Sequence, residues 1–146
     1  MNDPRPLVLD ANILIRAALG PRARGVIERH AGHADFFVPT YCADEAAEHL
    51  PVIIAKRGLD PRPIMAALNA VLGVVHLVDS PMYAGAMDEA LARLAGRDPE
   101  DADVLALALT LECPIWTEDR DFFGTGVATW TSAQVERYLA PPNPYS

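Results

Sequence analysis

Short apolar runs alternate along this chain with longer segments in which apolar residues recur at helical spacing. The first run ends at Asp10, and the segment after it carries apolar residues three and four positions apart. Short runs of this kind, bounded by Pro, Gly or a polar residue, are typical of buried strands. The pattern predicts strands at residues 7–9, 36–38, 74–78, 115–117 and 127–130.

Helices are expected between these strands, and several of their ends are marked by capping residues. Asp60 followed by Pro61 is a typical helix start, and Gly96 is a typical helix end. Pro51 lies inside one helical segment, which we expect it to kink or divide. The predicted helices span residues 12–19, 22–30, 41–57, 61–72, 82–95, 98–111 and 132–139.

This alternation predicts an α/β fold with a central, mainly parallel sheet of about five strands that helices cover on both faces. The 146 residues fit a single domain, which we place at residues 1–140, followed by a loose tail at 141–146. In such sheets, ligands bind outside the carboxyl ends of the strands. Residues that directly follow a strand are therefore the first candidates for a functional site.

Acidic residues follow two of the predicted strands and lie near the start of two of the predicted helices. Two glutamates on the helix after the second strand lie about one turn apart, and therefore on one face. Four separate parts of the chain could bring carboxylates to one edge of the sheet in this way. The candidate residues are Asp10, Glu45, Glu48, Asp98, Asp101, Asp103, Asp119 and Asp121.

Some of these acids have an ordinary structural explanation. Asp98 stands before a proline and is typical of a helix N-cap. Asp10 could cap the helix that begins near residue 12, and Glu48 is expected to be a solvated helical residue. These roles compete with a catalytic role at the same positions.

Asp101 is harder to explain in this way, because it shares a helix face with the apolar residues Leu105 and Ala108. An ionised acid on an inward face is costly unless it is paired or bound to a cation. The formal net charge is −8, and residues 98–121 contain eight acids but a single base, Arg120. Converging acids without counter-charges favour a divalent cation, and such sites hydrolyse phosphodiesters.

The cysteines and the N-terminus indicate the compartment. Cys42 and Cys113 have neither a CxxC motif nor a metal-binding spacing, so we expect buried, reduced thiols. The start of the chain lacks the basic segment and long apolar core of a signal peptide, and no apolar run is long enough to span a bilayer. We therefore expect a soluble, cytoplasmic protein without a membrane partner.

Four pieces of the sequence together resemble the PIN-domain family: LVLDAN near the start, the helical Glu45, DADVLALAL and PIWTEDRDF. They extend over nearly the whole chain in the family's order. The resemblance implies a metal-dependent nuclease with a parallel five-stranded sheet and a shared acidic pocket. Many bacterial members are ribonuclease toxins of the VapC type, so it also implies a homodimer and a small antitoxin that docks on an apolar surface near residues 41–72.

Carried over position by position, the resemblance assigns four acids as catalytic residues and as ligands of one or two Mg²⁺ or Mn²⁺ ions. Asp121 is the next candidate ligand. Asn12 and Thr117 are expected to orient water or a carboxylate. The four matching acids are Asp10, Glu45, Asp101 and Asp119.

Two of these assignments have neighbouring alternatives. The second acid could be Glu45 or Glu48, which lie on the same predicted helix. The third could be Asp101, Asp98 or Asp103, which are close together in the sequence. Both alternatives stay open at the level of the sequence.

The basic residues are concentrated near the N-terminus. Residues 1–30 contain five arginines against three acids, a net charge of +2, although the whole chain is acidic. Arginines can neutralise the phosphates of a nucleic acid. We therefore take Arg16, Arg22 and Arg24 as candidate contacts to RNA phosphates.

These observations lead to the hypothesis of a divalent-metal-dependent endoribonuclease that serves as the toxin of a toxin–antitoxin pair. The rival hypothesis is a PIN fold that binds RNA or a protein partner without turnover. The two differ in whether metal binding is accompanied by cleavage of RNA.

Overall fold

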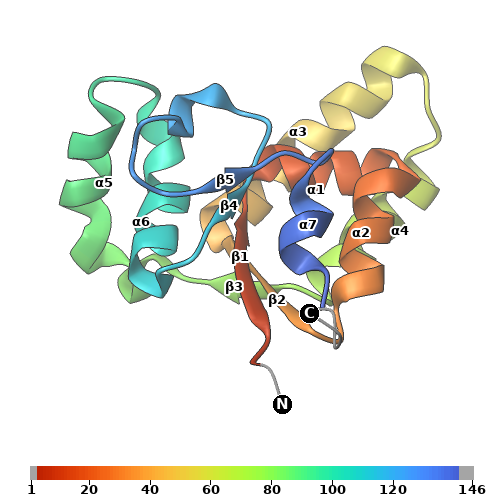
Figure 1. The fold of residues 1–146 in the computed structure, drawn as a ribbon. Helices are drawn as coiled ribbons and strands as arrows, with labels where there is room; N and C mark the ends of the chain where they lie inside the picture. The colour runs from red at the N-terminus through yellow and green to blue at the C-terminus, as the bar shows by residue number, and fades with distance from the viewer. Residues whose placement is uncertain (1–2, 142–146) are drawn as a thin grey trace.

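β1 (Arg5–Leu9) is the central strand of a five-stranded sheet in the computed structural model, which describes residues 3–141 (Figure 1). Its neighbours are β2 (Ala34–Pro39) and β4 (Ile115–Trp116). The edge strands are β3 (His76–Val78) beside β2 and β5 (Thr129–Trp130) beside β4. All four pairings are parallel, which confirms the predicted α/β fold with a mainly parallel sheet.

Helices cover both faces of this sheet. Figure 1 shows α5 and α6 on one side of the strands and α1, α2, α4 and α7 on the other. Helix α6 contacts β1, β2 and β4, and α1 packs against α2, α3 and α4. In chain order, the helices are α1 (Ala11–Leu19), α2 (Pro21–His30), α3 (Thr40–Arg57), α4 (Pro61–Leu72), α5 (Met87–Leu94), α6 (Ala102–Leu111) and α7 (Val135–Leu139).

The strand order β3-β2-β1-β4-β5 determines where a ligand site can form. From β1 the chain first builds the sheet to one side, through β2 and β3, and later adds β4 and β5 on the other side. The order therefore reverses between β1 and β4, and the loops that leave these two strands diverge around a crevice. Leu9 of β1 is paired with Trp116 of β4, so the residues after these two positions meet there.

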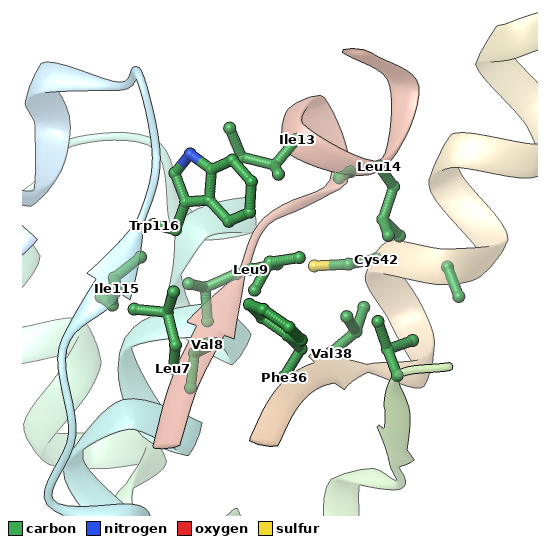
Figure 2. Close-up of a cluster of buried hydrophobic side chains, with 14 of the residues drawn as sticks. Leu7, Val8, Leu9, Ile13, Leu14, Phe36, Val38, Cys42, Ile115 and Trp116 are labelled. Carbon is green, nitrogen blue, oxygen red and sulfur yellow. The ribbon is translucent and has the colours of Figure 1, made fainter. Parts of the chain in front are cut away.

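The core packs around β1. Leu7, Val8 and Leu9 are fully buried, and Figure 2 shows them between Trp116 of β4 and Phe36 of β2. The indole Nε1 of Trp116 donates a hydrogen bond of 3.0 Å to Ser132 Oγ, which satisfies its polar atom. Burial of each large apolar side chain stabilises the fold by about 1.5–3 kcal/mol, so the positions of the strand ends are firmly held.

The helix predicted at residues 82–95 begins later than expected, at Met87. Two short 3₁₀ helices, Ser80–Met82 and Ala84–Ala86, precede it. Between them, the Tyr83 side chain is 1% exposed and its hydroxyl donates to Asp103 Oδ2.

Several other elements also begin later in the chain than predicted. The strand expected from residue 74 begins at His76, because the N–H groups of Val74 and Val75 donate to the Val71 carbonyl group and extend the turn after α4. β5 begins at Thr129 rather than at 127. The last helix begins at Val135 rather than at 132.

Helix α3 is not divided at Pro51. Proline removes the hydrogen bond that would reach the carbonyl group of Ala47, four residues earlier. Both Pro51 and Ala47 are exposed, so water can hydrate this carbonyl group and the helix continues to Arg57.

Two further expectations concern the cysteines and the membrane. Cys42 and Cys113 are buried and unbonded, as predicted. Within residues 3–141, no helix has the length and apolar character needed to cross a membrane. Apart from residue 141, the predicted tail lies outside the described residues.

Candidate functional site

Asp10 directly follows β1 and is 7% exposed. Its Oδ1 accepts a hydrogen bond of 3.0 Å from the backbone N–H of Ile13, so Asp10 caps α1 as the sequence allowed. Its Oδ2 accepts a hydrogen bond from the hydroxyl group of Thr117, the residue that follows β4. The in-register pairing of β1 with β4 brings the two side chains together.

Thr117 connects Asp10 to the acidic loop after β4. The side chain is 2% exposed, and its Oγ1 accepts a hydrogen bond of 2.9 Å from the backbone N–H of Asp119. Asp119 Oδ1 in turn accepts one of 2.9 Å from the N–H of Asp121. This chain of hydrogen bonds fixes the loop relative to β1.

Asp101, Asp119 and Asp121 form a cluster of three carboxylates. One oxygen from each lies within 4.8 Å of the others. Oδ2 of Asp101 is buried and, within the part of the chain that the structure describes, has no hydrogen-bond partner. A buried carboxylate oxygen without a partner is costly, and a cation at the cluster would supply one.

The loop that carries Asp119 and Asp121 is anchored from two sides. Nη1 of Arg97 donates hydrogen bonds of 2.5 Å to the carbonyl groups of Asp121 and Phe123. The side chain of Phe122 is fully buried in the core. These contacts hold two acidic side chains next to Asp101 despite their mutual repulsion.

A cleft of about 260 Å³ opens over these residues at the carboxyl edge of the sheet. The charged residues that line it are almost entirely acidic, and no Lys or Arg is among the described residues of its lining. The one histidine among the described residues of the lining is His49 of α3. The acids of the cleft lining are Asp10, Glu45, Asp98, Glu100, Asp101 and Asp119.

Burial and neighbouring charges raise the pKa values of three acids of the cleft, Asp10, Glu45 and Asp101. Burial raises the pKa of Asp10 to about 6, although hydrogen bonds from Thr117 and Ile13 oppose the shift. Burial and then the nearby Asp119 raise the pKa of Asp101 to about 7. The pKa of Glu45 is also raised, first by burial and then by the charge of Glu100. Each carboxylate therefore favours a proton or a cation beside it.

The structure places Glu45 and Glu48 differently. Glu45 is half-buried and lines the cleft, whereas Glu48 is exposed and does not. Glu45 is therefore the glutamate of α3 that the fold brings to the other acids.

The three aspartates at and just before the start of α6 also differ in their positions. Asp101 belongs to the carboxylate cluster. Asp98 lines the cleft and caps a short 3₁₀ helix through a hydrogen bond of 2.9 Å from the N–H of Glu100. Asp103 accepts a hydrogen bond from the Tyr83 hydroxyl group and is not part of the cleft lining.

The arginines predicted to contact phosphates do not all lie together. Arg16 and Arg22 line a second hollow, which shares Asn12 with the acidic cleft. Arg24 does not line either hollow, because its Nη1 donates a hydrogen bond of 3.0 Å to the carbonyl group of Ala17 at the end of α1.

Three residues of the cleft lining that carry ionisable side chains were not proposed from the sequence as site residues. His49 lies four residues after Glu45, a spacing that could have indicated it. Cys42 also lies on α3, and burial raises the pKa of its thiol. Glu100 precedes Asp101 near the start of the predicted helix, where acids are common, so its sequence position alone does not mark it.

The donors of the cluster fit a hard divalent cation. They are carboxylate oxygens, which Mg²⁺ and Mn²⁺ prefer over the nitrogen and sulfur ligands of zinc sites. The unpartnered Oδ2 of Asp101 and the absence of Lys and Arg from the described cleft lining agree with this chemistry.

Comparison with known proteins places the fold. The sequence model of the PIN domain matches residues 8–140. PAE2754 from Pyrobaculum aerophilum has a TM-score of 0.72 at 18% identity, with 93% of this chain and 90% of that chain covered. DNA-bound VapBC from Salmonella typhimurium gives a TM-score of 0.61 at 16% identity, with 88% and 98% covered. A toxin–antitoxin complex from Klebsiella pneumoniae gives 0.57 at 21% identity, with 86% and 97% covered.

At these identities the similarity to solved structures establishes a shared fold. No curated protein matches the sequence.

Proposed function

The chain belongs to the PIN-domain family, and on this basis we propose that it is a divalent-metal-dependent endoribonuclease and the toxin of a toxin–antitoxin pair. The observation that carries the proposal is the cluster of Asp101, Asp119 and Asp121, with its unpartnered buried oxygen. Without a cation, such a cluster lowers the stability of the folded state. Binding of a cation is therefore the simplest reason for its presence.

Of the residues proposed to hold one or two Mg²⁺ or Mn²⁺ ions, four line the cleft and the fifth, Asp121, belongs to the carboxylate cluster beside it. When bound, the metal would supply a Lewis acid for phosphodiester hydrolysis, activating water and stabilising the charge on the leaving oxygen. The proposed ligands are Asp10, Glu45, Asp101 and Asp119, together with Asp121.

Other residues of the chain would act by holding these groups. The Thr117 hydroxyl group donates to Asp10 and accepts from the backbone of Asp119, and so keeps both at a fixed distance. Asn12 lies in the wall of the cleft, where its carboxamide group is suited to donate a hydrogen bond to a phosphate oxygen. Asp101 would hold a proton until a cation replaces it, because its pKa is raised to about 7 by burial and by Asp119.

The toxin part of the proposal is supported by the kinds of assembly in which similar folds have been solved, including the toxin–antitoxin complex from Klebsiella pneumoniae and VapBC from Salmonella typhimurium. We place the protein in the cytoplasm, as a homodimer that a small antitoxin inhibits. An apolar hollow of about 410 Å³ between α3 and α4 is a suitable surface for the antitoxin. Its lining consists of Pro51, Ile54, Ala55, Leu59, Pro61 and Met65.

The test is an assay of the full chain and of two isosteric variants, Asp10→Asn and Asp101→Asn, on a panel of RNAs with and without Mn²⁺. We expect Mn²⁺-dependent cleavage by the wild type and little by the variants. Equal cleavage by all three proteins would contradict the site assignment. Metal binding without cleavage of any RNA would instead favour the rival function, a PIN fold that only binds RNA or a protein.

The nucleic acid itself is tested by DNA of the same sequences in the same assay. Cleavage of RNA alone is the expected result. Cleavage of DNA alone would leave the metal site in place and reject the ribonuclease assignment.

A further inference from the structure

A basic groove lies beside the acidic cleft. It has a volume of about 640 Å³ and is formed by α1, the start of α2, the end of α3 and the loops after β4 and β5. The groove and the cleft share three wall residues, Asn12, Ile15 and Ile53, so the two lie side by side. A ligand that occupies the cleft can therefore extend into the groove.

Three guanidinium groups line this groove: Arg16 from α1, Arg22 from α2 and Arg57 from α3. None of them makes a salt bridge or a side-chain hydrogen bond with another described residue. By contrast, Arg29, Arg62 and Arg93, which lie elsewhere, are each paired with a carboxylate. The charges in the groove are thus available to a ligand.

The single acid in the groove does not neutralise these charges through an ion pair. Glu118 Oε1 accepts a hydrogen bond of 2.6 Å from the backbone N–H of Ser132, which links the loops after β4 and β5. The groove therefore carries three positive charges against one negative charge. This is the reverse of the balance in the adjoining cleft.

The backbone of the groove also suits an anion. Gly20 and Pro21, at the start of α2, line the groove, and no side chain caps this helix. The first free N–H groups of the ten-residue helix therefore add to the positive potential of the arginines.

We propose that this groove is a phosphate-binding subsite for single-stranded nucleic acid, in which Arg16, Arg22 and Arg57 hold the backbone phosphates that flank the one bound in the acidic cleft. This inference rests on the proposed nuclease function for its substrate. It assigns the contacts to Arg57 in place of Arg24, whose guanidinium group is used within the fold. Arg57 is far from the other two in sequence, and the packing of α3 against α1 brings it to them.

A single strand of nucleic acid that is bound at both places would cross from the basic groove to the acidic cleft. The arginines attract the phosphates at long range and set the register of the strand, but they do not read its bases. The acidic cleft would repel the same phosphates until cations are bound. The groove therefore provides affinity that does not depend on the metal.

The test is equilibrium binding in EDTA, measured by fluorescence anisotropy with a labelled single-stranded RNA of about 20 nucleotides and a DNA of the same sequence, over about 50–300 mM KCl. The full chain is compared with Arg16→Gln, Arg22→Gln and Arg57→Gln and with the triple variant. Arg137→Gln is the matched control, because Arg137 is an exposed arginine of α7 that does not line the groove. Thermal melting checks that each variant is folded.

We expect each single variant to lower the affinity several-fold. A plot of log K against log salt has a negative slope, to which each phosphate contact of a single strand contributes about −0.7. In the triple variant, this slope should therefore become less negative by about 2. RNA and DNA should lose similar affinity, and the control should match the wild type.

Three results would overturn the subsite: an unchanged slope in the triple variant, an equal loss in Arg137→Gln, or a loss with RNA but not with DNA. The last result would indicate contacts to the ribose hydroxyl group rather than to phosphate.

Failure of this proposal can be told apart from failure of the proposed function. The binding assay contains no metal, whereas the nuclease assignment is tested by Mn²⁺-dependent cleavage. Cleavage by the wild type with unchanged binding by the triple variant would reject the groove alone. Binding that depends on the three arginines, without any cleavage, would reject the nuclease and keep the subsite.

Discussion

Clusters of ionisable side chains lie at both ends of the parallel strands, the amino edge and the carboxyl edge of the sheet. Among the described residues, the charges are paired at the amino edge only. Near the start of β1, Glu136 of α7 accepts hydrogen bonds of 2.9 Å from Arg29 and His30 of α2. These contacts, that of His30 first, lower the pKa of Glu136. At the carboxyl edge, Asp101 keeps an unpartnered oxygen, and burial raises its pKa to about 7.

The first cluster stabilises the fold, whereas the second is kept in place by the rest of the fold. The contacts of Glu136 join two helices that are distant in sequence, and the ionised form of Glu136 favours the native state. Asp101, Asp119 and Asp121 repel one another and are kept in place by the strand ends, Thr117 and Arg97. Opposite shifts in pKa are expected if the contacts of Glu136 serve stability and the acidic cluster, as proposed, binds a cation.

The largest effect is expected from removing one charge at each edge by an isosteric change. Asp119→Asn should lower Mn²⁺-dependent cleavage by more than about 100-fold, because the loss of a ligand exceeds the 10- to 100-fold effect of residues that only orient one. Glu136→Gln should leave cleavage unchanged. Initial rates on one RNA measure both. Similar losses in the two variants would remove the functional distinction between the edges.

The next effect concerns the hydroxyl group that links two of the acids. Thr117→Val keeps the shape of the side chain but removes its hydrogen bonds to Asp10 and Asp119. We expect metal affinity to fall by about 10- to 100-fold, as for other residues that hold a ligand in place. Calorimetric titration with Mn²⁺ measures this change.

Thr117→Ser provides the control, because it retains the hydroxyl group. Its metal affinity should remain within a few-fold of the wild type. An equal loss in Thr117→Val and Thr117→Ser would mean that packing, not the hydrogen bonds, explains the effect.

How far the sequence could predict these clusters depends on where their residues lie. Asp10 and Asp119 follow strands, so the alternation of apolar runs was enough to bring them to one edge. The choice of Glu45 over Glu48 depends on the rotation of α3, which the sequence pattern left open. Arg57 was not predicted at all, because its position beside Arg16 results from the packing of one helix against another.

The boundaries of the elements were predicted less well. Two short 3₁₀ helices take the place of the first part of the helix predicted from residue 82, and the helical pattern of apolar residues does not indicate this break. The continuity of α3 depends on the exposure of Pro51 and Ala47, which is a tertiary property. The sequence predicted which elements form, and packing determined their ends.

Without metal, the acidic cluster should make the protein less stable as pH rises. The folded-state pKa values of Asp10 and Asp101, about 6 and about 7, lie above the ordinary aspartate value of 3.8. The native state therefore binds more protons, and stability that is fully present below about pH 4 is lost as pH rises through 6 to 7. After allowance for solvent screening, we expect a loss of about 1–2 kcal/mol, or about 2–8 °C in Tm.

Thermal melting in EDTA at a series of pH values measures this loss. Mn²⁺ should restore most of the stability at the highest pH, because it binds the ionised carboxylates. Asp101→Asn should flatten the pH dependence and abolish most of the Mn²⁺ effect. A metal-free Tm that rises steadily from pH 5 to 8 would contradict the assignment of these two groups.

The smallest effect is expected at the paired edge, and its pH dependence should have the opposite sign. Glu136→Gln should cost about 0.2–1 kcal/mol at pH 7, since its contacts with Arg29 and His30 are partly exposed. The pKa of Glu136 is lowered from the ordinary glutamate value of 4.5, so this stabilisation is present above pH 4.5 and is lost as pH falls through the folded-state value. Urea unfolding of the variant and the wild type at neutral and acidic pH measures the difference, with Glu28→Gln as the control on an exposed, unpaired acid of α2. If the cost persists in acid, the pairing does not depend on the charge of Glu136, and the contrast with Asp101 would then rest on burial alone.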